Sequence, residues 1–552
     1  MDRCDGGSAG RVSPSDGRGD GASPNDPDGP LARLAHRLRC GGLAGRLGWG
    51  KADLLVVVVL TVVSVLVRWP ARPLDGLYHD DAWVAIGAMR SGLGSLPATS
   101  TDHPGHTVIL MAWSRMSGVG PEALVWPILI AGSLLAPALY LLLTRWTRRA
   151  GAVVLASAAA VAIVHVDFSA RAKTYAVDPL VILAIAAALP RVTKRRWSWR
   201  YAVGWLVVAG IVGTYSVFAA VAFAVAAVIV VLHPQGDRRV RIVTVGVQGL
   251  AQLAYLTWVR SSFNTSRLGN DWDVMYDGYA RVGGSPTASV ADFARHLGRA
   301  VSVFPGGTGW PAVALGLVVL FGLAHAARGG RNVLVARFLG MMLALAIIGS
   351  YLEIIPFGPS NSGALTGGRA GLWLIPSLAF GLAEAVRVGL SAWPTDRSIG
   401  GLVSLAVALV VAGSIIASTY SDAAPYPAPG AGSAARFVDG ERAHGASVVL
   451  TSTALYPFFA SSTTPISIQP TPDGVIGFVP QSLDHQVAVA NQPLRTIKAI
   501  DGADEVVVYE AVAGFADVEL KRLSTTLTEE GLRPAGDRRF GWARVQIWRR
   551  PR

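Results

Sequence analysis

Two adjacent carboxylates stand in the stretch LDGLYHDDAWVAIGAMR, which follows closely on a long hydrophobic run. A carboxylate can accept the proton of an attacking hydroxyl, and a neighbouring like charge raises the pKa of one member of such a pair. Asp80 and Asp81 are therefore candidates for general-base catalysis. The alternative is that Asp80 only caps a surface helix, because apolar residues follow it at helical spacing and a helix start favours negative charge.

Cationic and aromatic side chains follow in two further polar stretches. TSTDHPGH contains Asp102 and His103, and DFSARAKTYAVDP contains Arg171, Lys173 and Tyr175. Lysine and arginine can neutralise a phosphate leaving group without a metal. We therefore predict a transferase that handles an anionic, lipid-linked donor, with both cations at the phosphate and the other three side chains at the substrate. The alternative for the cations is that they only anchor a helix end at the lipid headgroups.

A divalent metal site is an alternative role for the histidines of this region. Asp102, His103 and His106, with His79 nearby, could bind such an ion. Pro104 in a helix-starting turn explains the local pattern without a metal, and both cysteines of the chain lie near its N-terminus. We therefore predict no metal ligands and interpret His106 as structural, while the need for a divalent cofactor stays open.

The composition is that of a protein that crosses a membrane several times. Of the 552 residues, 51% are hydrophobic and 15% are charged, and the mean hydropathy is +0.43. The net charge of +13 does not indicate a nucleic-acid partner, because arginine and lysine fall in short clusters between apolar runs instead of along one face. Residues 1–50 are rich in Gly, Asp, Ser, Pro and Arg, which predicts a disordered tail.

Long apolar runs predict a mainly α-helical bundle in the bilayer. We expect about eleven spanning helices, because the hydrocarbon core requires roughly 17 to 25 apolar residues per helix. They lie near residues 52–70, 122–144, 150–167, 175–190, 201–215, 216–233, 241–259, 310–327, 333–355, 371–389 and 399–419. Basic residues cluster in alternate short loops, most densely at 191–200, and such loops face the cytoplasm. The N-terminus is therefore predicted to be cytoplasmic, and the loops 71–120 and 260–309 and the C-terminus to lie outside.

The composition changes after about residue 420. The β-branched runs SVVLTS and EVVVYEAV and the alternating ARVQIW predict short strands. Between the last two, Leu520, Leu523 and Leu527 share one face of a predicted helix. We therefore divide the chain into three parts: a cytoplasmic tail at 1–50, a membrane domain at 51–420 and a small extracytoplasmic α/β domain at 421–552.

Several stretches resemble motifs of one class of integral membrane enzymes, the GT-C-type glycosyltransferases. HDDAWVA resembles the acidic motif that opens their first outer loop, and DHPGHTVILMAW resembles their HPPL stretch. FSARAKTYAVDPLVILAIAAAL is similar to the segment in which a basic residue stands two places before tyrosine. GGRAGLWLIPSLAFGLAEA is similar to a late helix with an arginine, and GWARVQIWRR resembles the ending of members with an outer α/β domain. The resemblance is closest to the bacterial family 39 group, related to protein O-mannosyltransferases and to the aminoarabinose transferase of lipid A.

The resemblance implies an enzyme that transfers a sugar from a polyprenyl-phosphate donor to a glycan, lipid or protein acceptor on the outer face of the cell membrane. Asp80 would be the catalytic base, with Asp81 orienting the acceptor or sharing the proton. Lys173 and Arg369 would contact the donor phosphate, and a single in-line attack would invert the anomeric carbon. The chain departs from the family pattern at Asp81, where many members have glutamate, and at Arg171, where an acidic residue is common.

Two other classes of function are alternatives. A secondary transporter places ionisable groups near the middle of the bilayer, in broken helices related by repeats, whereas these groups cluster at one interface. A non-catalytic envelope scaffold would have no cavity that joins Asp80 to Lys173. If the chain is an enzyme, the acidic pair and the lysine must therefore meet in one place.

Overall fold

A computed structural model describes most of the chain, and residues 56–552 form one compact unit. The predicted tail up to residue 49, the predicted span at 399–419 and Asp102 lie outside the described residues. The described residues are 50–77, 79–90, 92–96, 103–117, 120–147, 149–195, 197–233, 237–262, 278–304, 306, 309–329, 332–357, 369–392, 430–470, 478–490, 493–514 and 516–552.

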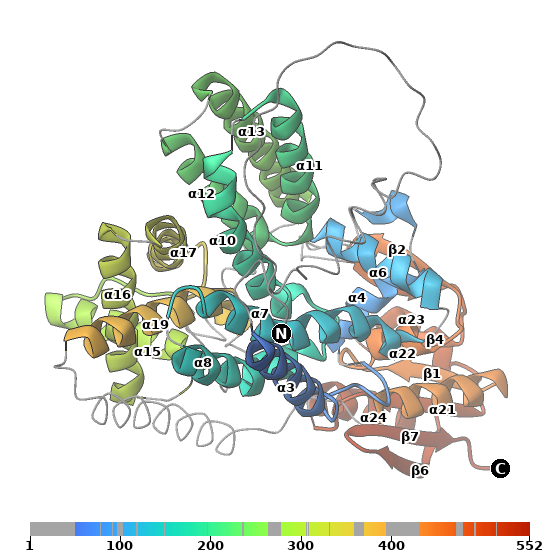
Figure 1. The fold of residues 1–552 in the computed structure, drawn as a ribbon. Helices are drawn as coiled ribbons and strands as arrows, with labels where there is room; N and C mark the ends of the chain where they lie inside the picture. Colours follow the sequence, from blue (N-terminus) through green and yellow to red (C-terminus); the bar gives the residue numbers. More distant parts are fainter. Residues whose placement is uncertain are drawn as a thin grey trace, which may run out of the picture. The chain divides into compact units, whose positions relative to one another are not determined.

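Every predicted apolar run within the described residues lies in a helical segment (Figure 1). The helices are α3 (Lys51–Arg68), α7 (Trp126–Leu143), α8 (Arg149–Val161), α9 (Ile163–Ser169), α10 (Asp178–Lys194), α11 (Trp199–Tyr215), α12 (Val217–Leu232), α13 (Arg238–Ser262), α16 (Gly309–Arg328), α17 (Val333–Tyr351) and α19 (Ile375–Ala392). α11 and α12 are separate helices because Ser216 leaves the helical conformation, at φ −155° and ψ 156°. Its hydroxyl then accepts the Ala219 N–H at 3.0 Å and caps α12.

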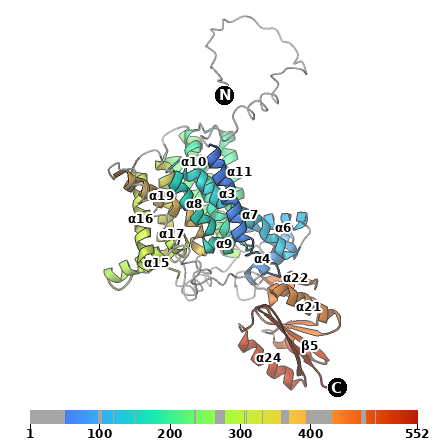
Figure 2. The ribbon, with the colours of Figure 1, turned by 60° about the horizontal axis from the view of Figure 1, so that its bottom comes forward.

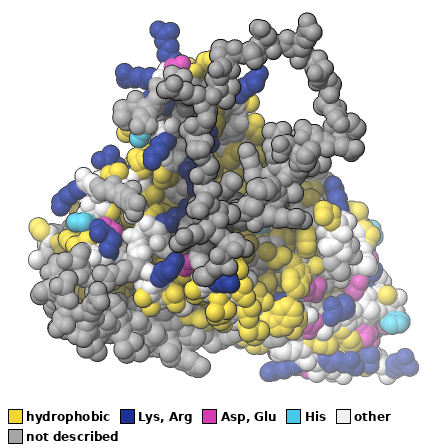
Figure 3. All heavy atoms as spheres, in the orientation of Figure 1, with side chains coloured by type: hydrophobic (Ala, Val, Ile, Leu, Met, Phe, Trp, Pro, Cys, Tyr) yellow, Lys and Arg dark blue, Asp and Glu magenta, His cyan; other side chains and the backbone are white. Residues whose placement is uncertain are grey.

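The apolar surface of these helices suits a lipid environment. Among the described residues, five helical segments are long and apolar enough to cross a membrane, or six if α8 and α9 form one span bent by 54°. α11 exposes four large aliphatic side chains, Val203, Val207, Val208 and Ile211, and such a contiguous surface is a liability in water. Figure 3 shows hydrophobic side chains over much of the described helical part. The total of about eleven spans stays a prediction.

Three further helices lie in segments that were predicted as loops. α4 (His79–Arg90) and α6 (Pro104–Ser117) lie in the predicted loop 71–120. α15 (Pro286–Val303) lies in the predicted loop 260–309, where no helix was expected. α15 forms because the Ser285 hydroxyl accepts the Ala288 N–H at 3.2 Å and Pro286 fits the first turn. The short 3₁₀ helices are η1 (Leu93–Ser95), η2 (Pro121–Val125), η3 (Thr174–Ala176) and η4 (Arg369–Leu374).

The C-terminal part is an α/β domain (Figure 2). Its mixed five-stranded sheet has the strand order β4-β1-β5-β7-β6. β1 is parallel to β4 and β5, whereas β7 is antiparallel to β5 and β6. The three predicted strands and the predicted helix between the last two are confirmed as β1, β5, β7 and α24. The elements are α21 (Ala431–Ala443), β1 (Ser447–Leu450), α22 (Leu455–Ser461), β2 (Ile466–Pro470), β3 (Phe478–Ser482), β4 (Val487–Val489), α23 (Pro493–Ile500), β5 (Glu505–Glu510), α24 (Asp517–Glu529), β6 (Arg533–Phe540) and β7 (Ala543–Arg549).

The two faces of this sheet belong to different cores. On one face, Val506 and Val508 pack with Leu523 and Leu527 of α24. The alternate strand residues, such as Val507, share a second core with α4, α6, α21 and α22. Because burial of this shared apolar surface stabilises both partners, the first predicted loop and the C-terminal domain fold as one packed structure.

Two glycines allow the chain before α4 to touch the start of α21. The Gly432 N–H donates to the carbonyl of Asp75 at 2.9 Å. Gly76 has a φ of +98°, and a Cβ at this position would lie 2.2 Å from the nitrogen of Gly432. Only glycine fits such a conformation at such a distance. The segment that leads into α4 is therefore fixed directly to the C-terminal domain.

Candidate active site

Asp80, in the first turn of α4, carries the carboxylate of the candidate site. Its Oδ2 lies 3.8 Å from Nη1 of Arg369, and its side chain is 41% exposed. Burial acts to raise the pKa of the Asp80 carboxyl, but the positive charges around it, led by Lys173 and Arg369, lower that pKa below its usual value. Asp80 is therefore an ionised carboxylate at neutral pH.

The two cations that act most on Asp80 come from distant parts of the sequence. Lys173 lies between α9 and η3 in an extended conformation, at φ −123° and ψ 158°. Its ammonium nitrogen lies 5.3 Å from the ring centroid of Trp83 on α4. Arg369 begins η4, and its guanidinium carbon lies 5.9 Å from the ring centroid of Tyr175. The chain segments that carry Asp80, Lys173 and Arg369 therefore come together at one carboxylate. The enzyme hypothesis requires this proximity of the acidic pair and the lysine.

Asp81 and Arg171 are buried beside this group. Oδ1 of Asp81 accepts the backbone N–H of Ala172 at 3.0 Å and so ties α4 to the segment that carries Lys173. Arg171 forms an ion pair with Asp167 at 2.8 Å. The proton-sharing role of Asp81 and the phosphate contact of Arg171 stay predictions. The observed contacts of Asp81 and Arg171 instead hold in place the segment that carries Lys173.

A second set of buried contacts holds η3. Arg68, at the end of α3, is fully buried and donates to the carbonyl of Ala160 at 2.9 Å, next to the bend between α8 and α9. Its Nη2 lies 2.7 Å from Nδ1 of His165. Because arginine only donates, this Nδ1 accepts and the ring proton sits on Nε2, which lies 3.2 Å from the carbonyl of Ala176. One arginine–histidine pair thus holds both the bend and the end of η3.

Two histidines of the first predicted loop, His103 and His106, lie at the start of α6. The carbonyl of His103 accepts the Thr107 N–H at 3.1 Å. His106 is buried, with Nε2 3.3 Å from the carbonyl of Ala172, which agrees with its structural interpretation. No group of three or more His, Cys, Asp or Glu side chains is arranged to hold a metal ion in the part of the chain that the structure describes. Because Asp102 lies outside that part, the substrate roles of Asp102 and His103 stay predictions.

Sequence reasoning missed two residues of this region, Asp167 and Tyr456, and considered a third, His79, only as a possible metal ligand. Asp167, the buried partner of Arg171, stands four residues before it. This helical spacing of opposite charges could have indicated the ion pair from the sequence. His79 and Tyr456 pack together beside Asp80, with ring centroids 4.6 Å apart. Tyr456 belongs to α22 of the C-terminal domain, and no local pattern links it to a residue so far away in the sequence.

The burial of Asp81 predicts how stability depends on pH. Burial raises the pKa of this carboxyl from 3.8 to about 6, despite the opposing charges of Arg171 and Lys173. A raised folded-state pKa adds stability below about pH 4 that is lost as the pH rises through 6. A shift of this size corresponds to at most about 3 kcal/mol. Asp81 should therefore lower the stability of the wild type, relative to a variant that cannot ionise at this position, as the pH rises from 4 to 7.

Asp81→Asn isolates this contribution, because the amide oxygen can still accept the Ala172 N–H but cannot ionise. Thermal unfolding of both proteins would be measured at pH 4, 5, 6 and 7, and the unfolding temperature of the wild type minus that of the variant should fall as the pH rises. Equal slopes would mean that Asp81 ionises at its usual pKa.

Comparison with known proteins bears on the fold. The sequence matches no protein-family model and none of the curated proteins. The structure is similar to a crystal structure of ArnT from Cupriavidus metallidurans bound to undecaprenyl phosphate, with a TM-score of 0.51 at 13% identity, covering 89% of this chain and 97% of that chain. A crystal structure of ArnT from the same organism in the apo state has a TM-score of 0.50 at 12% identity, covering 90% and 98%. This likeness confirms the predicted GT-C-type helical bundle with a small C-terminal α/β domain.

Proposed function

We propose that the chain is a membrane glycosyltransferase that moves a sugar from a polyprenyl-phosphate carrier to a hydroxyl of the cell envelope. The observation that carries the proposal is the ionised carboxylate of Asp80 beside Lys173 and Arg369. A base and phosphate-binding cations are the two parts that this transfer needs. The fold supports the lipid carrier, because the similar ArnT structure is bound to undecaprenyl phosphate.

The proposed reaction is a single displacement at the anomeric carbon. The acceptor oxygen bonds to that carbon while Asp80 takes the proton of the acceptor hydroxyl. The bond from the anomeric carbon to the phosphate oxygen breaks, and its electron pair leaves with the polyprenyl phosphate. Lys173 and Arg369 stabilise the charge of the leaving phosphate. Attack opposite the leaving group inverts the anomeric carbon.

Donor binding would also strengthen the base. The positive charges of Lys173 and Arg369 lower the pKa of Asp80, and a carboxyl of low pKa is a poor proton acceptor. A phosphate that pairs with these two cations cancels much of their effect on the carboxylate. The pKa of Asp80 then rises, so that the base is strongest when the donor is in place.

The proposal also includes membership of the family 39 group. It further includes a cytoplasmic N-terminus and a reaction on the outer face of the membrane, and the basic clusters in alternate loops support this orientation. The acceptor is a glycan, a lipid or a protein. Lys173 and Arg369 supply positive charge at the phosphate by themselves, so the proposed step does not require a metal.

The alternative classes of function fit these contacts less well. A scaffold has no need of a carboxylate that is kept ionised and 41% exposed next to two cations. A transporter would place such groups along a central path through broken helices. Here Asp80 belongs to α4, which packs against the C-terminal domain and is not one of the helices suited to span a membrane.

Transfer of label from defined donors tests the proposal. Membranes that contain the protein and membranes that lack it would receive undecaprenyl-phosphate-linked sugars, each radiolabelled in the sugar. We expect label from at least one donor to enter the envelope fraction only when the protein is present. Equal incorporation with and without the protein, for every donor, would refute the proposed activity.

A further inference from the structure

An apolar groove of about 430 Å³ lies between α10 and α11, and its size is within the range of ligand pockets. Ile185 and Leu189 of α10 form one side, and Trp205 and Val208 of α11 form the other. α12 packs against both helices and closes the groove with Phe223 (Figure 1). Val208 is 51% exposed, so the groove opens onto the outer surface of the helical part. In a bilayer this opening faces the lipid.

A glycine widens the groove. Gly204 stands beside Trp205 on α11 and is one of the lining residues. In membrane helices, glycine usually lets the backbones of two helices approach closely. A Cβ at Gly204, however, would meet no described atom within 4 Å. This glycine therefore does not serve contact between the described helices, and its missing side chain leaves room in the groove instead.

Cationic side chains gather at one end of the groove. Residues 191–200, which lead from the end of α10 into α11, include five basic and no acidic residues. Arg200, in the first turn of α11, lines the groove together with Tyr201. Arg195 is close enough to Tyr201 for its charge to act on the phenol. The apolar groove thus ends at a concentration of positive charge.

The positive charges at this end of the bundle also act on one another. Arg191 lies in the last turn of α10, and Arg145 lies in the loop between α7 and α8. Burial, together with the charge of Arg191, lowers the pKa of the Arg145 guanidinium. Like charges at such distances repel, and an anion placed among them relieves the repulsion. This end of the helices is therefore suited to bind an anionic group.

Aromatic rings connect the basic end to the apolar walls. The ring centroid of Trp197 lies 5.3 Å from that of Tyr201 and 5.7 Å from that of Trp205. The indole N–H of Trp205 donates to Oε1 of Gln248 at 2.7 Å, which fixes the ring against α13. Tryptophan and tyrosine are enriched at the level of the lipid headgroups. The basic end therefore corresponds to the headgroup level, and the apolar walls correspond to the level of the acyl chains.

This groove is separate from the candidate active site. Lys173 precedes α10, whereas Arg195 follows its last residue. The 17 residues of α10 span about 25 Å at the rise of an α-helix. The cations assigned to the donor phosphate and the basic end of the groove therefore lie at opposite ends of one helix.

We propose that the groove binds an anionic phospholipid, with its phosphate beside Arg195 and Arg200 and one acyl chain along α10 and α11. A further apolar helix would fill the groove but would leave these cations without a counterion. The polyprenyl phosphate is proposed to bind at the other end of α10, so a lipid of the bilayer itself is the occupant. This inference goes beyond the proposed function and does not depend on it.

Photochemical labelling tests this assignment. The full-length protein would be placed in phosphatidylcholine nanodiscs that contain a small fraction of phosphatidylglycerol with a diazirine in one acyl chain. Labelled peptides would be quantified by mass spectrometry after irradiation. The peptides of α10 and α11 that line the groove should be labelled about fivefold more, or better, than by phosphatidylcholine with the same diazirine.

Filling the groove should remove the label. Gly204→Phe places a ring in the open space and should lower labelling of these peptides by about fivefold or more. Gly210→Phe is the matched control, because Gly210 lies on the same helix, has equally open surroundings and is not one of the residues that line the groove. It should be labelled as the wild type is.

Removing the charges should remove the preference for the anionic lipid. Arg195→Ala combined with Arg200→Ala should lower labelling by phosphatidylglycerol to the level of phosphatidylcholine, because basic residues at the membrane surface attract anionic lipids. Arg328→Ala combined with Arg337→Ala removes the same charge near the ends of α16 and α17. This second pair should leave labelling of α10 and α11 unchanged.

Four results would overturn the proposal. Equal labelling by the two lipids would mean that only bulk lipid enters the groove. Unchanged labelling in Gly204→Phe or in the Arg195 and Arg200 double variant would place the lipid elsewhere. An equal loss in Gly210→Phe would mean that the label reports the whole lipid-facing surface of α11. Displacement by undecaprenyl phosphate at a lower concentration than by unlabelled phosphatidylglycerol would assign the groove to the sugar carrier.

Discussion

Replacing Asp80 with asparagine is expected to lower the rate of sugar transfer by about a thousandfold, within the range of a positioned general base. The amide has nearly the same size and can still accept a hydrogen bond at the start of α4, but it cannot take the proton of the acceptor. Initial rates with purified protein and saturating labelled donor measure the effect. A variant that keeps more than about a tenth of the wild-type rate would remove Asp80 from the role of base.

Asp75→Asn is the matched control for that result. Asp75 stands five residues earlier and accepts hydrogen bonds from the Ser433 hydroxyl at 2.7 Å and from Arg436 at 3.0 Å. Exposed pairs of this kind contribute little to stability, so transfer should stay within about twofold of the wild type. An equal loss in both variants would indicate that the segment before α4 is damaged and not that a base is missing.

Removing either cation is expected to weaken binding of undecaprenyl phosphate by about ten- to a hundredfold, because a charge-assisted hydrogen bond contributes roughly 1.5 to 3 kcal/mol. Lys173→Ala and Arg369→Ala both delete a positive charge that acts on Asp80. The double variant should bind more weakly than either single variant. Equilibrium binding to protein in nanodiscs measures the change.

Two further variants distinguish charge from fold in this experiment. Arg369→Lys keeps the positive charge and should retain more affinity than Arg369→Ala. Arg436→Ala removes an arginine whose side chain is 59% exposed in the C-terminal domain, and it should bind as the wild type does. If Arg436→Ala weakened binding as much as Arg369→Ala, the phosphate would be held by the general positive charge of the protein and not by this site.

Most of the fold could be predicted because each element has a local cause. A bilayer requires long apolar runs, and every such run within the described residues is helical. The strands β1, β5 and β7 are short β-branched or alternating segments, which local propensity also favours. α15 escaped prediction because its 18 residues are amphipathic and too polar to be recognised as a span. The sharing of one core by α4, α6 and the sheet depends on tertiary packing, which no local pattern contains.

The candidate site was predictable in its residues and less so in their arrangement. The order of the motifs led to Asp80, Lys173 and Arg369, and in the structure the charges of Lys173 and Arg369 both act on Asp80. The sequence could not separate Asp80, which is 41% exposed, from the buried Asp81, because the two are adjacent and chemically alike.

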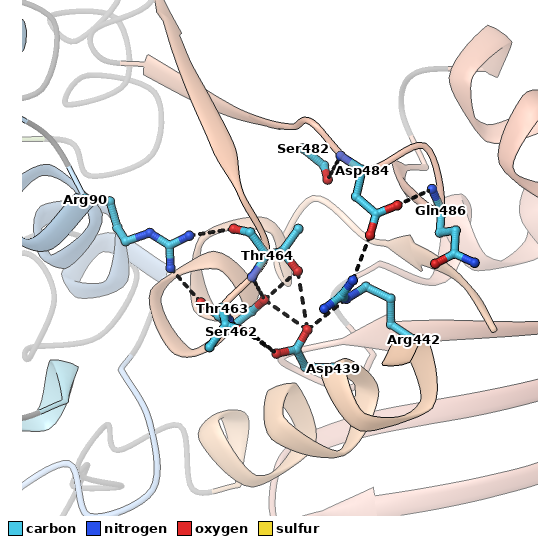
Figure 4. A network of polar contacts seen from close by, with 9 residues as sticks. All are labelled: Arg90, Asp439, Arg442, Ser462, Thr463, Thr464, Ser482, Asp484 and Gln486. Atoms are coloured by element: carbon cyan, nitrogen blue, oxygen red, sulfur yellow. Dashed lines mark hydrogen bonds and ion pairs between the residues drawn. The ribbon is translucent and has the colours of Figure 1, made fainter. Parts of the chain in front are cut away.

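The place of Tyr456 in this region could not be predicted for a different reason. Its place beside Asp80 depends on the docking of α22 against α4. The shared core maintains this docking, and so does Arg90 of α4, which donates to the carbonyl of Ser462 at 2.6 Å, just after the end of α22 (Figure 4).

The affinity of Asp80→Asn for undecaprenyl phosphate tests the central claim most directly, because the carboxylate of Asp80 and the donor phosphate are proposed to share the same two cations. Asp80 is an anion that competes with the phosphate for Arg369 and Lys173. The Asp80→Asn variant, whose amide is neutral, should therefore bind the lipid about threefold to tenfold more tightly than the wild type, while transfer is lost. Unchanged or weaker binding by Asp80→Asn would contradict the account, because the carboxylate and the phosphate would then not share these cations.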